Sequence, residues 1–332
     1  MNKIERVKAV LEGRQPDRPP VSFWYHFGPD CVAGPRAVEV HTRHVETYDL
    51  DFLKIMDDNR YPRSATSGGV IADVRDLDKL HVLSGDEDSF GRQLQVIQAL
   101  AQRFGSQLLM ATTVFNAWGT LRLMTTSPAS SYGPPSVRQT IDPRDEAMSR
   151  FLREAPAALA RALDIIAESL ANFARNCLTA GADGVYLSVR DDWVDNPENG
   201  TGIYDRLVRP TDLKILSGAA QGSFNMLHVC GQAVDFRRFA NYPIQVLSWA
   251  DRYAGPSIAD VVGWARPALC AGLDNLGTLV TGSPEDCAQQ VADAITQAGD
   301  HPFILAPGCT FDPHVVPAEN LHAIRRAVEV GS

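Results

Sequence analysis

The sequence contains no basic run and no long hydrophobic run. Its 332 residues carry a formal net charge of −9 at pH 7, and this argues against a nucleic-acid partner, because phosphate contacts need clustered lysine and arginine. A membrane-spanning helix needs roughly 20 consecutive apolar residues, and no such stretch occurs. The charged amphipathic start is unlike a secretory signal. We therefore expect a cytoplasmic protein without nucleic-acid or membrane partners.

Several motifs and architectural signals are also absent. No Gly-x-Gly-x-x-Gly pattern follows the first strand-like segment, which argues against a dinucleotide-binding fold. No nucleophile elbow or Ser-His-Asp signature is evident, so the sequence does not point to serine hydrolase chemistry. There is no internal repeat, low-complexity tract or linker. We therefore expect one domain over residues 1–332.

Short apolar segments alternate with helical patterns along the whole chain. Such near-continuous apolar segments are typical of parallel strands that are covered on both faces. Eight strand–helix units favour an α/β fold of the (β/α)8 TIM-barrel type, with an open doubly wound sheet as the alternative. The expected strands are 21–27, 51–57, 108–116, 184–189, 223–230, 244–250, 268–274 and 303–309. The clearest expected helices are 91–104, 151–179, 205–220, 257–266, 284–298 and 317–330.

The barrel prediction directs attention to the carboxyl ends of the strands, where active sites of this fold lie. Polar and aromatic side chains at or near these ends are candidates for binding substrate or cofactor. For the aromatic residues ordinary core packing is the alternative, and for Asp57 the alternative is orienting a ligand histidine. The candidates are Tyr25, His26, Asp57, Asn116, Tyr186 and Asp274.

Two of the six cysteines lie at expected strand ends together with a histidine. In a cytosolic chain of this size disulfides are improbable, so packing, catalysis and metal binding are the choices. Cys230 lies two positions after His228, and Cys309 ends the last expected strand. The other four cysteines lie away from strand ends and are expected to pack in the core: Cys31, Cys177, Cys270 and Cys287.

His228, Cys230 and Cys309 have the residue types and spacing of a zinc site. Residues two apart in a strand point to the same side, so His228 and Cys230 can both face the barrel axis. Zinc prefers imidazole and thiolate ligands, and a catalytic zinc keeps three protein ligands and one open position. The alternative is a set of ordinary core residues, because a lone buried cysteine usually packs as a small hydrophobic side chain.

Longer segments carry a family resemblance that covers essentially the whole chain. The opening "RVKAVLEGRQPDRPPVSFWYH" and the later "LHVCG", "AGLDN" and "APGCTFDPHVVPAENLHAI" resemble the uroporphyrinogen decarboxylase superfamily, a (β/α)8 barrel family. The His-x-Cys followed by a distant Cys is similar to its zinc-dependent corrinoid methyltransferase branch, which includes the methylcobamide:coenzyme M methyltransferases. This resemblance implies that His228, Cys230 and Cys309 bind zinc.

The decarboxylase branch of the superfamily matches less well. That branch carries an arginine-rich motif after the first strand, where this chain has "YHFGPD", and a histidine where this chain has Cys309. The resemblance therefore implies a zinc-dependent methyltransferase that moves a methyl group between a corrinoid and a small thiol or another acceptor or donor. The aromatic residues near strand ends, Tyr186 among them, would then offer a platform for the corrin ring.

Other functions remain open at this point. They are a decarboxylase-like enzyme, a cobalamin-independent methyltransferase, a demethylase of a methylated compound, and a non-catalytic zinc-stabilised module that docks a corrinoid protein. The chain has no Asp-x-His-x-x-Gly corrinoid-binding motif. A cobalamin would therefore come as free cofactor or on a partner protein. The oligomeric state is open, with a homodimer among the options.

Overall fold

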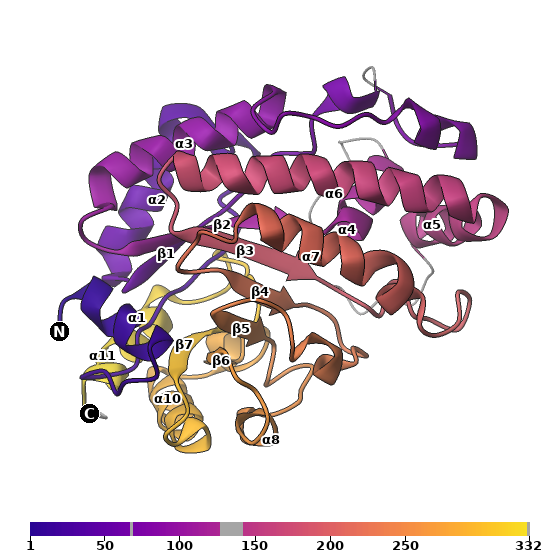
Figure 1. The fold of residues 1–332 in the computed structure, drawn as a ribbon. Helices are drawn as coiled ribbons and strands as arrows, with labels where there is room; N and C mark the ends of the chain where they lie inside the picture. Colours follow the sequence, from indigo (N-terminus) through magenta and orange to yellow (C-terminus); the bar gives the residue numbers. More distant parts are fainter. Residues whose placement is uncertain (67–68, 127–141, 331–332) are drawn as a thin grey trace.

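The computed structural model describes residues 1–66, 69–126 and 142–330. Its centre is a seven-stranded, wholly parallel sheet in which the strands lie side by side in chain order. Figure 1 shows the sheet curling around an interior, with the helices outside it. The strands are β1 (Phe52–Ile55), β2 (Leu109–Phe115), β3 (Gly184–Val189), β4 (Met226–Val229), β5 (Val246–Trp249), β6 (Ala268–Leu273) and β7 (Phe303–Pro307).

Helices connect these strands and cover the outer face of the sheet. Several begin at side-chain caps, as at α10, where the Ser283 hydroxyl accepts from the Asp286 amide and the Asp286 carboxylate accepts from the Ser283 amide. The helices are α1 (Lys3–Leu11), α2 (Gly34–Tyr48), α3 (Asp88–Phe104), α4 (Ala117–Met124), α5 (Pro143–Glu154), α6 (Pro156–Thr179), α7 (Arg209–Gly218), α8 (Ile258–Val262), α9 (Thr278–Thr281), α10 (Pro284–Ala298) and α11 (Ala318–Val330).

The sheet is not a closed eight-stranded barrel, because the expected first strand at 21–27 forms only isolated bridges. Val21 bridges Leu305 of β7, and Tyr25 bridges Phe311. On the other side the Val21 carbonyl accepts from the Asp51 amide, while the Val21 amide donates to the Asp51 carboxylate. The Asp51 carboxylate thus accepts the hydrogen bond that the backbone of a neighbouring strand would accept in a regular ladder. The segment fills the gap between β1 and β7 without forming a regular ladder, which corrects the (β/α)8 prediction to a TIM-like curled sheet.

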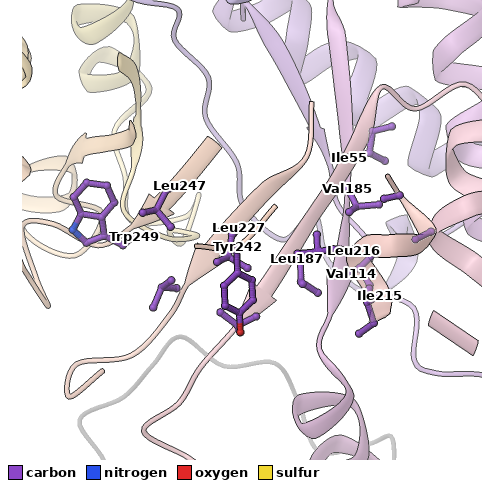
Figure 2. Close-up of a cluster of buried hydrophobic side chains, with 14 of the residues drawn as sticks. Ile55, Val114, Val185, Leu187, Ile215, Leu216, Leu227, Tyr242, Leu247 and Trp249 are labelled. Atoms are coloured by element: carbon purple, nitrogen blue, oxygen red, sulfur yellow. The ribbon is translucent and has the colours of Figure 1, made fainter. Parts of the chain in front are cut away.

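The two faces of the sheet bury different side chains because successive residues of a strand alternate. The outer face packs against the helices; Figure 2 shows Val185, Leu187 and Leu227 of the strands beside Ile215 and Leu216 of α7. The inner face packs a smaller cluster of side chains, which α1 joins with Val7 and Val10. The strand residues of this inner cluster are Phe52, Leu109, Ala111, Tyr186, Met226, Val246, Ala268, Cys270, Ile304 and Ala306.

The observed helices differ from the expected ones in their number and in where they begin. The helix expected at 151–179 is two helices, because Pro156 follows Ala155, whose backbone is not helical. The helix expected at 205–220 begins with a π-helical turn at Tyr204–Val208 before α7. Helices α2 and α4 were not among the expected ones. In the described part of the chain, no helix combines the length and the hydropathy needed to cross a membrane.

Candidate metal centre

His228 and Cys230 come from the carboxyl end of β4 and lie on its inner face. His228 is buried and pairs with Ser188 of β3 and Ser248 of β5. Cys230 follows the strand, but its amide still donates to the Val189 carbonyl at 2.9 Å, which continues the pairing with β3 past the strand end. The spacing of two residues therefore directs both side chains inward, as the sequence predicted.

Cys309 lies two residues beyond β7, on a turn packed tightly against its neighbours. The Gly308 amide donates to the Leu273 carbonyl at the end of β6, at 3.0 Å. A Cβ atom at Gly308 would lie only 2.6 Å from the Cα of Ala250, which follows β5. Glycine allows the turn to approach the end of β5 this closely, and this approach places Cys309 over the inner face of the sheet.

The three predicted ligands meet in one place. One nitrogen of His228 and the sulfurs of Cys230 and Cys309 all lie within 4.8 Å of one another. Zinc bonds of about 2.0–2.3 Å would separate tetrahedral ligands by roughly 3.5–3.8 Å, so a small contraction fits the ion. Among the described residues no other group of three histidine, cysteine or carboxylate side chains meets this criterion. The cluster therefore offers three protein ligands and leaves a fourth position open.

The His228 imidazole is oriented for metal binding. Its Nδ1 lies 3.3 Å from the Ser248 hydroxyl oxygen. Its Nε2 is buried and has no hydrogen-bond partner in the described part of the chain. A proton on Nδ1, donated to Ser248, leaves the Nε2 lone pair free, which is the usual arrangement of a metal-bound histidine. A buried nitrogen without a partner is costly, and a bound cation would satisfy it.

The two thiols influence each other's pKa. The pKa of Cys309 lies well below its ordinary value, mainly because the Cys230 thiol donates a hydrogen bond to it and also because His228 is near. The same hydrogen bond, together with burial, raises the pKa of Cys230 well above its ordinary value. The two sulfurs therefore interact closely. A zinc ion would bind both as thiolates, since thiolate is the form that binds metal.

Aromatic and charged side chains pack beneath the ligands. The Tyr186 ring stacks on the His228 ring with centroids 5.3 Å apart and meets the Trp24 ring edge-on at 5.7 Å. The Lys54 ammonium lies 4.4 Å from the centre of the Tyr186 ring. Burial raises the pKa of Tyr186 well above its ordinary value, so the phenol stays protonated. Tyr186 therefore supports the ligand histidine from inside the barrel.

With this geometry in place, comparison with known families identifies the fold family. The family model described as uroporphyrinogen decarboxylase (URO-D) matches residues 56–330. The chain belongs to the uroporphyrinogen decarboxylase family. The family prediction from the sequence is thereby confirmed, and all three candidate ligands lie inside the matched region. The comparison with curated proteins found no match.

Solved structures share the fold of this uroporphyrinogen decarboxylase family member. A methyltransferase from Methanosarcina mazei superposes with a TM-score of 0.72 at 17% identity, covering 99% of both chains. At this identity the likeness concerns the fold. A B12-independent methionine synthase from Shewanella sp. W3-18-1 has a TM-score of 0.47 at 11% identity, covering 71% of this chain and 65% of its own.

Tyr25 and His26 lie close together in the chain but in different surroundings. Tyr25 packs in an aromatic group with Phe27 and Phe311, at centroid distances of 4.8 and 5.3 Å. Phe311 follows Cys309 by two residues, so Tyr25 supports the turn that carries this ligand. The His26 Nδ1 lies 2.5 Å from an Asp58 carboxylate oxygen, and the imidazole is about one third exposed.

Asp57 is not part of the cluster of the three candidate ligands, and its part in cofactor binding stays a prediction. Its carboxylate accepts from the amide and side chain of Asn59, and burial raises its pKa to about 7. It lines a cavity of about 250 Å³ between the ends of β1 and β2 and helices α3, α4 and α6, and none of the three ligands lines this cavity. Because side chains alternate along a strand, Asp57 shares the outward side of Ile55.

Asn116 and Asp274 have local backbone roles. The Asn116 side chain accepts from the Gly119 amide and caps the amino end of α4. The Asp274 carboxylate accepts from the Leu276 and Gly277 amides and forms a tight turn after β6. Neither joins the cluster of the three candidate ligands, and a role of either in cofactor binding stays a prediction.

Ser248 and Lys54 lie near the candidate centre and are not among the residues predicted from the sequence. Both lie within apolar strand segments, "VLSW" and "FLKI", where a polar side chain is unexpected. A buried polar residue inside a strand of a barrel has to point either to the helices or to the interior. That anomaly was the available signal, but only the register between strands shows that Ser248 pairs with His228.

Proposed function

We propose that this protein is a zinc-dependent methyltransferase that moves a methyl group between a corrinoid and a small thiol. The observation that carries the proposal is the meeting of His228, Cys230 and Cys309 ligand atoms within 4.8 Å at the carboxyl ends of the strands. Three protein ligands are the number that a catalytic zinc uses, whereas a structural zinc is normally closed by four.

The ligand set selects the chemistry. Two thiolates and one neutral imidazole cancel the charge of Zn²⁺, which suits the activation of a thiol better than the acidification of water. When bound, zinc would lower the pKa of an added thiol while leaving electron density on its sulfur for attack on a methyl carbon. A free thiol, with a pKa of about 8.5, is mostly protonated at pH 7.

The chain's own residues hold and orient the reacting groups. Ser248 fixes the His228 imidazole through Nδ1, and Tyr186 packs against its ring. Gly308 sets the position of Cys309 by its close approach to Ala250. Methyl transfer from cobalt to sulfur requires neither an oxyanion hole nor a general acid, which agrees with the absence of a serine-hydrolase signature. The corrinoid would be free cofactor or be carried by a partner protein.

The decarboxylase activity in the family's name has less support here. No arginine follows Tyr25 in "YHFGPD". The corresponding histidine is replaced by Cys309, whose sulfur joins the ligand cluster. A cysteine whose sulfur lies close to a second cysteine and a histidine is suited to metal binding rather than to proton donation during decarboxylation.

The proposal is tested with the Cys230→Ala variant and a matched cysteine control. We expect the wild-type protein to bind one zinc per chain and to demethylate methylcobalamin with a thiol from a panel, followed by the visible spectrum. Cys230→Ala should lose both zinc and methyl transfer, because two ligands do not retain the ion. Cys31→Ala, which changes a partly buried cysteine outside the cluster, should keep both. Full activity of metal-free Cys230→Ala would refute the proposal.

A further inference from the structure

Lys54 is a buried cation that forms no ion pair with the residues that the structure describes. It lies in β1 and is only 4% exposed. Among the described residues its Nζ forms no ion pair; it contacts the Met56 sulfur at 3.0 Å and the faces of two aromatic rings. A buried ammonium group without a counter-ion is strongly disfavoured, so its retention in the barrel interior requires a reason.

The surroundings of Lys54 compensate its charge only in part. The Tyr186 and Trp24 ring centres lie 4.4 and 5.8 Å from Nζ, and aromatic faces attract cations by about 0.5–2 kcal/mol. Burial lowers the pKa of Lys54 to about 8, while Cys309, Asp58 and Asp57 oppose that change. At pH 7 the ammonium form still dominates, so the interior holds a real positive charge.

That charge lies beside the candidate centre rather than at a distance from it. Lys54 and His228 contact the same ring, Tyr186. Cys309 also interacts electrostatically with Lys54. A zinc with two cysteine thiolates and one imidazole is formally neutral, and a third thiolate makes it anionic. Once zinc neutralises the Cys230 and Cys309 thiolates, a net negative charge at the centre would arise when a further thiol binds and releases its proton.

We propose that Lys54 is a positioning residue whose buried positive charge stabilises a thiolate at the His228–Cys230–Cys309 centre. This inference rests on the proposed function. In the step concerned, the S–H bond of the incoming thiol breaks, its proton goes to solvent, and the sulfur keeps the electron pair. Lys54 would act through its electric field and not as a ligand, in a low-dielectric surrounding in which a single charge has a large effect.

The test compares Lys54→Met with Lys54→Arg in protein loaded with Co²⁺ in place of zinc. The probe is 2-mercaptoethanol, which is uncharged, and its binding is followed by the thiolate-to-cobalt charge-transfer absorption. At pH 7 we expect Lys54→Met to bind this thiol about tenfold more weakly than wild type. Lys54→Arg should restore most of the affinity. Co²⁺ binding itself should change little, because the thiol-free centre is neutral.

Controls separate this role from structural and substrate-binding roles. Lys79→Met removes an exposed lysine that pairs with Asp76 and should leave thiol affinity unchanged. Lys54→Met should melt at or above the wild-type temperature, because it removes an unpaired buried charge. An unfolded Lys54→Met variant, or equal thiol affinity in Lys54→Met and wild type, would overturn the inference.

A second thiol and the wild-type protein distinguish the remaining outcomes. If Lys54→Met loses affinity only for 3-mercaptopropionate, then Lys54 binds the carboxylate of a substrate and the inference is wrong. If wild-type protein binds no metal, the proposed function is refuted, and so is this inference, which depends on it. If wild type binds metal and thiol while Lys54→Met does so equally well, only the role of Lys54 is refuted.

Discussion

At the scale of single residues, Ser248 determines how the ligand histidine can bind a metal. Its hydroxyl lies 3.3 Å from Nδ1 of His228, and the opposite nitrogen, Nε2, is buried without a partner in the described chain. When Nδ1 carries the ring proton, the Ser248 hydroxyl accepts from it and the lone pair lies on Nε2. In that tautomer the imidazole can bind a cation through Nε2.

We therefore predict that Ser248→Ala weakens zinc binding without unfolding the protein. Loss of the partner at Nδ1 frees the imidazole to rotate and to change tautomer, and such outer contacts are typically worth 10–100-fold in metal affinity. Competition with a chromophoric chelator measures the change. Ser217→Ala is the control, because that hydroxyl is exposed and bonds only to the Lys214 carbonyl of its own helix. Equal zinc affinities of Ser248→Ala and wild type would show that Ser248 does not orient His228.

At the scale of elements, the turn after β7 shows how backbone packing places a ligand. Gly308 follows the strand directly, and its amide is tied to the end of β6. Ala250 Cα lies where a Gly308 side chain would extend. The distance from Cys309 to His228 and Cys230 therefore depends on residue 308 being glycine, which has no side chain to hold the turn away from β5.

A methyl group at Gly308 should separate the ligands. Its Cβ would lie 2.6 Å from Ala250 Cα, closer than such atoms approach, so Gly308→Ala must shift the turn. We expect at least a tenfold loss of zinc affinity and a destabilisation of about 1–3 kcal/mol. Chelator competition and urea unfolding measure the two effects. Gly263→Ala is the matched control, since open space surrounds that position, and a zinc affinity of Gly308→Ala equal to that of Gly263→Ala would contradict this account.

Strands were predicted better than helices because their apolar runs are short and continuous. Seven of the expected segments contain β1 to β7; β3 has the expected bounds, and the other six strands are shorter than expected at one or both ends. The segment 21–27 carries the same apolar pattern but pairs only at bridges. In the structure the Val21 amide donates to the Asp51 side chain instead of to a partner strand. The local sequence cannot show this, because it depends on contacts in the folded protein. Helix α2 escaped prediction because its buried face includes two histidines, His41 and His44.

At the scale of the whole molecule, the stability of the protein in acid depends on His41 and His44, which are buried where α2 packs on the sheet. The His41 Nδ1 is bonded to the Ala37 carbonyl, and its Nε2 accepts from the Met56 amide just beyond β1. Both nitrogens are thus used by the neutral ring. Burial lowers the pKa of His41 and of His44 to about 4.

We predict that His41→Gln is less sensitive to acid than wild type. A lowered native pKa contributes stability above the unfolded value of 6.5, and this contribution is lost as pH falls toward 4. The advantage of wild type over His41→Gln should therefore shrink by roughly 1.4 kcal/mol per pH unit below 6.5. Urea unfolding at pH 7, 6 and 5 measures it. His81→Gln, at an exposed position, should track wild type, and a constant difference for His41→Gln would contradict the assignment.

The sequence alone determined the family, the alternation of strands and helices, and the choice of His228, Cys230 and Cys309 as candidate ligands. These follow from local patterns: apolar runs, a two-residue spacing and residue chemistry. Only the tertiary structure decided that Asp57 faces a separate cavity, that Ser248 and Lys54 adjoin the centre, and that the first strand does not complete the barrel. Strand register and side-chain direction decide these points, and they depend on contacts between residues far apart in the chain.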